Sequence, residues 1–270
     1  MAGLKTLGVA FISFFLFLPV LNADELVPGR TLILQRNPEA AADFFCKYAV
    51  SHPKDKEKAA ESLAFCGRTL DALQDSLTGA AEKSCYWNKG GSRTPECMMA
   101  FASEYNGRFG ANAFQYEHGI TYIKYTGSHY KELMEKHPKS SFAAEADFYL
   151  TLHNMIGLPD VVLPRIKAFL ARHPKGEWNR RGLLLWARVN EDVWYIHRKW
   201  SWMLYNSQLS PEELIIRAEP FRQEALKTYL GIMKEKKTFE GMAAAKEYEN
   251  LSKNEEESTV YGITNDSIPG

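Results

Sequence analysis

Cysteine is the residue type with the most definite chemistry in this 270-residue chain, which carries four cysteines. They are Cys46, Cys66, Cys85 and Cys97, and none belongs to a C-x-x-C pair of the kind that binds zinc or exchanges disulfides. Cys85 and Cys97 bracket a segment rich in Gly, Asn, Ser and Pro. We therefore expect a disulfide that closes this short loop and stabilises the fold by about 3 kcal/mol.

Cys46 and Cys66 remain for a second disulfide, although helix geometry argues against it. A helical hairpin that turns near Pro53 offsets the two cysteines by roughly 9 Å along the helix axis. Bridged cysteines need Cα atoms only about 5.5 Å apart. Two alternatives stay open: a tilted or shifted hairpin that allows the bridge, or a free Cys66 thiol buried on an apolar helix face.

Aromatic side chains gather late in the chain, where five of the six tryptophans fall between positions 178 and 202. Trp186 and Trp200 continue an aliphatic stripe at helical spacing, which indicates core positions. Trp194, Tyr195 and Trp202 lie off that stripe and are our candidates for a groove that takes a partner's helix or extended peptide. In the alternatives, the whole cluster is the core of a C-terminal helical layer, or it lies on a membrane interface.

Catalytic and metal-binding patterns are missing from the sequence. It contains no G-x-S-x-G, H-E-x-x-H, P-loop or G-x-G-x-x-G motif, and His118 and His129 are 11 positions apart across a predicted break. We therefore predict a protein that is not an enzyme and that holds no metal and no cofactor. Lys plus Arg and Asp plus Glu both number 33, which gives no general attraction to nucleic acid.

The N-terminus is typical of a secretory signal peptide. Lys5 precedes an apolar run from 7 to 21, and the polar mature chain is expected to begin after cleavage at Ala23. The run is about 15 residues, whereas a membrane-spanning helix needs about 20, which argues against the alternative of an uncleaved anchor. We expect a periplasmic or secreted protein with no membrane span after cleavage, a compartment where cysteines form disulfides.

Apolar residues recur at helical spacing through most of the chain, which predicts an all-α fold. The only candidate strand is Thr31 to Leu34, residues 78–95 are expected to form a loop, and Pro220 is expected to kink or break its helix. The expected helices cover 38–50, 55–77, 96–106, 111–125, 129–136, 141–156, 158–172, 177–206, 212–236 and 238–256.

The tripeptide His-Pro-Lys occurs three times, beginning at His52, His137 and His173, each time between two predicted helices. Proline ends one helix and favours a tight turn into the next, because the residue before it is pushed out of the helical conformation. Pro138 and Pro174 are 36 positions apart, close to the repeat period of about 34 residues in tetratricopeptide proteins.

The stretch from about Tyr116 to Trp194 resembles tetratricopeptide-repeat proteins of the bacterial cell envelope. The resemblance rests on the segment Lys136-His137-Pro138-Lys139-Ser140. The helix predicted after it begins with the spaced alanines Ala143, Ala144 and Ala146. The resemblance implies an array of antiparallel helical hairpins, a TPR-like α-solenoid. Such stacks bury a continuous core and present a concave surface for proteins or peptides.

We predict four regions: a signal peptide (1–23), an N-terminal helical region that contains the cysteines (24–106), a TPR-like region (107–257) and a disordered tail (258–270). The leading functional hypothesis is an exported, non-catalytic interaction scaffold whose partner is another envelope protein or a peptide. The alternative is an accessory subunit, a helical enzyme or a ligand-binding protein with an aromatic-lined pocket.

Overall fold

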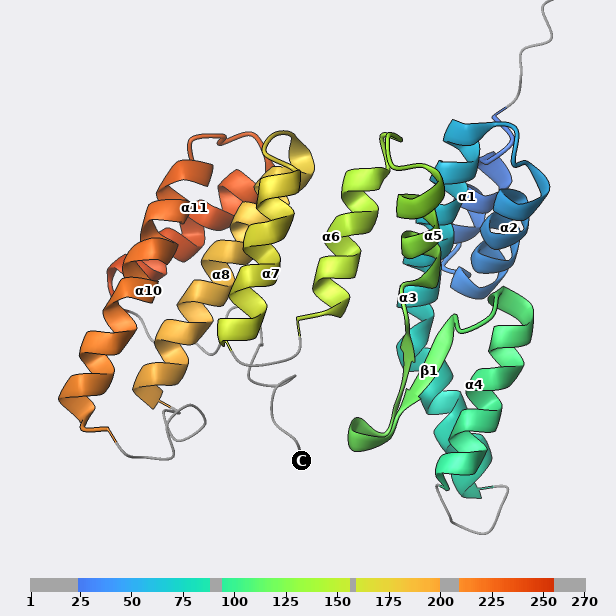
Figure 1. The fold of residues 1–270 in the computed structure, drawn as a ribbon, viewed down its shortest axis with the longest axis horizontal. Coiled ribbons are helices and arrows are strands. Elements are labelled where there is room, and N and C mark those ends of the chain that lie inside the picture. The colour runs from blue at the N-terminus through green and yellow to red at the C-terminus, as the bar shows by residue number, and fades with distance from the viewer. Residues whose placement is uncertain (1–23, 88–93, 156–158, 200–208, 255–270) are drawn as a thin grey trace, which may run out of the picture.

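A computed structural model of the chain describes residues 24–87, 94–155, 159–199 and 209–254 (Figure 1). These residues are mostly helical with one two-stranded sheet, which confirms the helical fold class. Within the described ranges, no helix is long and apolar enough to cross a membrane. The elements are α1 (Val27–Leu34), α2 (Pro38–Ser51), α3 (Lys56–Trp87), α4 (Pro95–Phe109), β1 (Phe114–Glu117), β2 (Tyr122–Tyr125), α5 (Ser128–Lys136), α6 (Ala143–His153), α7 (Pro159–Arg172), α8 (Glu177–Lys199), α10 (Pro211–Ile232) and α11 (Phe239–Ser252), with one 3-10 turn (His118–Ile120) between the strands.

The predicted signal peptide (1–23), Trp202 and the predicted tail (258–270) lie outside the described residues.

The three His-Pro-Lys tripeptides each join two helices, as predicted: α2 to α3, α5 to α6, and α7 to α8. In every copy the histidine N–H donates to the carbonyl four residues earlier, at 3.0 Å for His52, 2.8 Å for His137 and 3.0 Å for His173. The proline that follows has no N–H to continue the helix. The same local chemistry therefore ends three helices in the same way.

Successive helix pairs pack against one another along the molecule. The contacts run from α3 to α5 and α6, from α6 to α7 and α8, and from α8 to α10 and α11. Figure 1 shows α6 between the α7–α8 pair and α5. The helices that meet at Pro138 and Pro174 also contact each other, so each pair covers the apolar side of its neighbour.

Polar contacts reinforce this packing at the turns. Glu57, in the first turn of α3, accepts the backbone N–H of Ser141 at 3.2 Å. The buried Asp147 of α6 accepts from Arg172 at 2.8 Å and from the ring of His173 at 2.7 Å. In both cases an acid of one helix pair binds the turn or the helix end of the next pair.

Both disulfides form, and the described residues include no free cysteine. Cys85 and Cys97 join α3 to α4 with Cα atoms 5.8 Å apart, and Cys46 and Cys66 join α2 to α3 with Cα atoms 5.1 Å apart. The axial offset expected for a strictly antiparallel hairpin is therefore absent, and of the two alternatives for Cys66 the structure has the bridged one.

The predicted loop over 78–95 is wrong for its first half, because α3 continues to Trp87. Leu77, Ala81 and Cys85 follow one another at a spacing of four residues and are all buried. This continued apolar face, held to α4 by the Cys85–Cys97 disulfide, supports the helix through a stretch that has weak helical propensity.

The predicted helix over 111–125 is also wrong, because β1 and β2 form an antiparallel hairpin in which Phe114 pairs with Tyr125. The N–H groups of Ile123 and Tyr125 donate to the side chains of Thr78 and Gln74 on α3, at 2.9 Å and 2.8 Å. The helix thus satisfies the backbone of β2, and aromatic and β-branched residues suit a strand with one buried face.

Two smaller expectations are also corrected. Thr31 to Leu34 belong to helix α1 rather than to a strand. A helix break at Pro220 is wrong, because Pro220 lies inside α10, which is continuous from Pro211 to Ile232.

Candidate functional site

The structure buries Trp194, one of the three predicted groove residues, in the core. Trp194 is only 4% exposed and belongs to a buried cluster of α8, α10 and α11 that includes Ala218 and Tyr229. Tyr195 is half-buried and packs against the same cluster. Trp202 lies outside the described residues. Trp194 is therefore a core residue, as in the alternative in which the tryptophans form a C-terminal helical layer.

A different part of α8 lines an open cavity of about 380 Å³, here called the central cleft. Its walls come from α6, α8 and the start of α11. The central cleft is lined by Phe148, Leu152, Arg181, Leu184, Leu185, Arg188, Phe239 and Glu240.

Helical spacing explains why α8 presents these side chains together. Arg181, Leu184, Leu185 and Arg188 follow the i, i+3, i+4, i+7 spacing of one helix face. Leu185 packs into the apolar cluster of α6, α7 and α8, whereas Leu184 packs into the cluster of α8, α10 and α11. The central cleft therefore lies where two parts of the core meet.

Aromatic side chains stand in and beside the central cleft. The ring of Phe148 lies 5.4 Å from that of Trp178, and the guanidinium of Arg181 lies 4.4 Å from the centre of the Trp178 ring. Phe239, the first residue of α11, is 70% exposed. Partly covered aromatic and arginine side chains of this kind are common anchors of protein interfaces.

Carboxylates of the molecule neutralise both arginines of the central cleft. Arg181 contacts the buried Glu240 at 3.3 Å and Glu177 at 2.6 Å. Arg188 donates to Glu247 at 3.1 Å. The arginines are thus held in place by ion pairs, and the lining that remains for a ligand is mainly apolar.

Phe148, Trp178 and Phe239 are not among the residues that the sequence pattern predicts for a binding site. The spacing of Arg181, Leu184 and Arg188 in the sequence does predict that these side chains share one face of α8. Nothing in the local sequence shows that α6 and α11 border that face.

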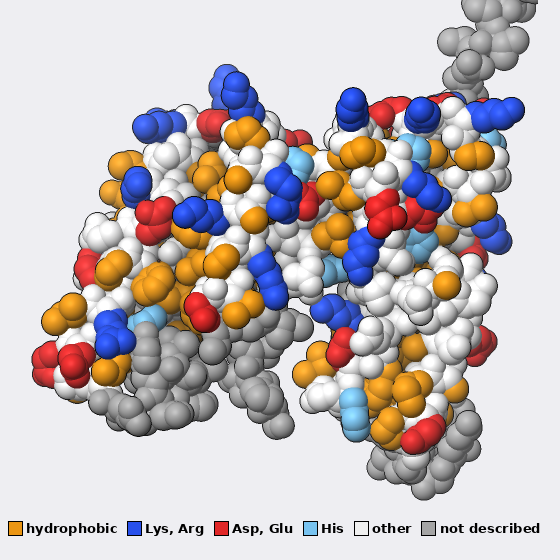
Figure 2. Space-filling view, in the orientation of Figure 1, with side chains coloured by type: hydrophobic (Ala, Val, Ile, Leu, Met, Phe, Trp, Pro, Cys, Tyr) orange, Lys and Arg blue, Asp and Glu red, His pale blue; other side chains and the backbone are white. Residues whose placement is uncertain are grey.

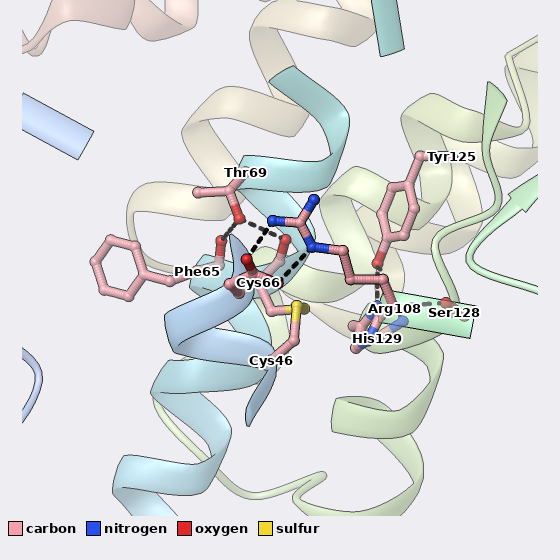
Figure 3. Close-up of a disulfide and its surroundings, with 9 residues drawn as sticks. Cys46, Phe65, Cys66, Thr69, Arg108, Tyr125, Ser128 and His129 are labelled. Atoms are coloured by element: carbon pink, nitrogen blue, oxygen red, sulfur yellow. Dashed lines mark hydrogen bonds and ion pairs between the residues drawn. A yellow bond between two sulfur atoms is a disulfide. The ribbon is translucent and has the colours of Figure 1, made fainter. Parts of the chain in front are cut away.

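A group of possible metal ligands lies at the first disulfide (Figure 3). The ligand atoms of Cys46, Cys66 and His129 are all within 4.8 Å of one another. Both sulfurs are used in the disulfide, and His129 Nδ1 lies 3.1 Å from the hydroxyl of Tyr125. Burial lowers the pKa of His129 and favours the neutral ring. With the disulfide formed, this group is a packed polar contact in the core.

An Asp–His pair connects the first two helix pairs. His153 Nε2 of α6 lies 2.7 Å from Asp71 of α3, and the hydroxyl of Tyr130 donates to the same carboxylate at 3.1 Å. His153 Nδ1 is buried and has no hydrogen-bond partner within the described part of the chain. The pair therefore joins α3 to α6 through a largely buried hydrogen-bond network that also includes Tyr130.

Basic and acidic side chains are interspersed over the face of the molecule in Figure 2, without a region of one sign. The observations define a class of protein. It is mostly helical, its helices follow one another in pairs, and a mainly apolar cleft lies between α6, α8 and α11. Neither a protein-family model, nor a curated protein, nor a solved structure matches this chain.

Proposed function

We propose that this protein is an exported, non-catalytic scaffold that binds another envelope protein or a peptide in the central cleft. The observation that supports the proposal most is the composition of the cleft, whose walls come from three different helix pairs. A ligand in this position contacts α6, α8 and α11 together, as ligands of TPR-like helical arrays do across several hairpins.

The side chains of the central cleft suit a helix or an extended segment with apolar anchors. The exposed Phe239 ring stands at the edge of the cleft and Leu152 lines it. Phe148 and Leu184, by contrast, are nearly buried and form its apolar floor. The arginine charges are already compensated by Glu240 and Glu247. A mainly apolar ligand segment therefore fits better than a highly charged one.

Export is the second part of the proposal. The N-terminal sequence is typical of a signal peptide, and the Cys46–Cys66 and Cys85–Cys97 disulfides are compatible with an oxidising compartment. A periplasmic or secreted location is the one that agrees with both features.

Affinity purification of the full chain from envelope extract, with mass spectrometry of the retained proteins, tests the proposal. The variant Phe239→Asp places a charge at the edge of the central cleft. Ile216→Asp is the matched control, because Ile216 is 71% exposed on α10, compared with 70% for Phe239. We expect Phe239→Asp to lose at least 90% of the specific partner while Ile216→Asp retains it. Equal retention by both variants would argue against the central cleft as the binding site.

A further inference from the structure

A second cavity, of about 400 Å³, lies at the N-terminal end of the molecule and is here called the N-terminal pocket. It is lined by Ile33, Arg36, Pro38, Phe65, Arg68, Thr69 and Ala72, from α1, the start of α2 and α3. It shares no lining residue with the central cleft. Ligand binding in the N-terminal pocket is therefore independent of the function proposed above.

The aromatic wall of the N-terminal pocket is well fixed. The ring of Phe65 stacks on Phe45 at 4.8 Å between centroids, and the guanidinium of Arg68 lies 4.7 Å from the Phe65 ring centre. Figure 3 shows the Phe65 side chain pointing away from the Cys46–Cys66 disulfide, which anchors the neighbouring residue of α3. The pocket thus has a preformed apolar surface.

The two arginines of the N-terminal pocket differ in how they are paired. Arg68 forms two hydrogen bonds with the buried carboxylate of Glu145, so its charge is compensated. The exposed guanidinium of Arg36 has no hydrogen bond or ion pair to any of the described residues. The pocket therefore combines an apolar interior with one uncompensated positive charge.

The N-terminal pocket extends only a short way along α3. Its lining residues on α3 extend from Phe65 to Ala72, and seven residues of helix rise about 10 Å. One large apolar side chain fits within this length. The chemistry required is a short apolar group with an anion beside it.

We infer that the N-terminal pocket binds the C-terminal residue of a partner polypeptide. In such a residue an apolar side chain and the free α-carboxylate branch from the same carbon atom, so both reach the pocket together. The side chain packs on Phe65 and Ile33, and the carboxylate accepts hydrogen bonds from the Arg36 guanidinium. In an internal residue the carboxyl group is part of a peptide bond, so no carboxylate lies beside the side chain.

Fluorescence anisotropy with labelled Gly-Ser-Gly-Ser-Leu peptides, one with a free C-terminal carboxylate and one amidated, tests this inference on the full chain. We expect the free-acid peptide to bind at least about tenfold more tightly, as for a charge-assisted hydrogen bond. Arg36→Gln removes the charge and should abolish this difference between the two peptides. Lys47→Gln, which removes an exposed charge of α2 outside the pocket, should preserve it.

Three results would overturn the inference. They are no binding of the free-acid peptide, equal affinity for both peptides, or binding of sodium octanoate without binding of the free-acid peptide. Thermal denaturation of each variant checks its folding, and Arg36 is exposed and without side-chain partners among the described residues. Phe239→Asp should leave peptide binding unchanged, so failure at the N-terminal pocket is separable from failure at the central cleft.

Discussion

At the scale of single residues, Trp194 fills the interior between α8 and α10 and sits beneath the Arg198 guanidinium, 4.7 Å from its ring centre. Replacing a buried tryptophan by alanine leaves a cavity that the surroundings fill only in part. We expect Trp194→Ala to lower the free energy of unfolding by about 3–5 kcal/mol in urea denaturation. Unchanged stability together with weaker partner binding would restore Trp194 as a surface anchor.

Arg36 occupies an unusual backbone conformation, with φ of 56° in the left-handed region. Its N–H donates to the carbonyl of Ile33, and the next N–H donates to that of Leu32, which is the Schellman arrangement at a helix end. This conformation favours glycine, which has no Cβ, so Arg36→Gly should stabilise the fold by about 1 kcal/mol. Asn254→Gly is the control, since Asn254 has φ of 54° and asparagine tolerates this conformation, so its gain should be smaller.

The buried ring of His129 predicts a contribution to the pH dependence of stability. Burial lowers its folded-state pKa below 6.5, with nearby Glu132 acting in the opposite direction. The unfolded chain therefore binds more protons, and stability should fall as the pH drops below 6.5 towards the folded-state pKa. We expect urea denaturation between pH 7.5 and 5.5 to show a smaller loss in His129→Gln than in the unmodified chain. An equal loss in both would contradict this assignment.

The residue types in the sequence predicted the Cys85–Cys97 disulfide, left the Cys46–Cys66 disulfide open, and assigned the buried Trp194 to a groove. Helical spacing over 177–206 places Trp194 off the aliphatic stripe. In the structure α10 covers the side of α8 that carries Trp194, so α8 has a second buried face. Arg36 had no signal in the local sequence, since its role depends on Phe65, which follows 29 positions later in the chain.

At the scale of the helices and strands, α3 organises the N-terminal part of the molecule. It carries Cys66 and Cys85, which join it to α2 and α4, and it supplies hydrogen-bond acceptors to the N–H groups of β2. The predictions failed where such contacts decide the local structure, namely at the end of α3 and in the β1–β2 hairpin. They succeeded where one local signal is enough, as at the three His-Pro-Lys turns.

The two disulfides should each stabilise this arrangement by about 3 kcal/mol, because they close loops of 20 and 12 residues in the unfolded chain. The paired variants Cys46→Ala/Cys66→Ala and Cys85→Ala/Cys97→Ala should show these losses in urea denaturation. Each paired variant, when treated with a reductant, should lose only the contribution of its remaining disulfide. A variant as stable as the unmodified chain would contradict the role of that bridge.

At the scale of the whole molecule, consecutive helix pairs form one series of contacts from α2 to α11. Helical periodicity predicted the mostly helical class, and the recurrent turn predicted the pairing of neighbouring helices. The central cleft needs α6, α8 and α11 side by side, and no local pattern indicates that Phe148 and Phe239 lie at the same cavity. A relationship to tetratricopeptide repeats remains a prediction based on resemblance.

Photo-cross-linking in the envelope tests the binding role of the central cleft most directly. A photoreactive phenylalanine analogue is placed at position 239, at the edge of the cleft, or at position 216 on α10, two positions of nearly equal exposure. We expect one discrete cross-linked partner from position 239 and none from position 216. No cross-linked partner at 239, or the same products from both positions, would contradict the binding role of the central cleft.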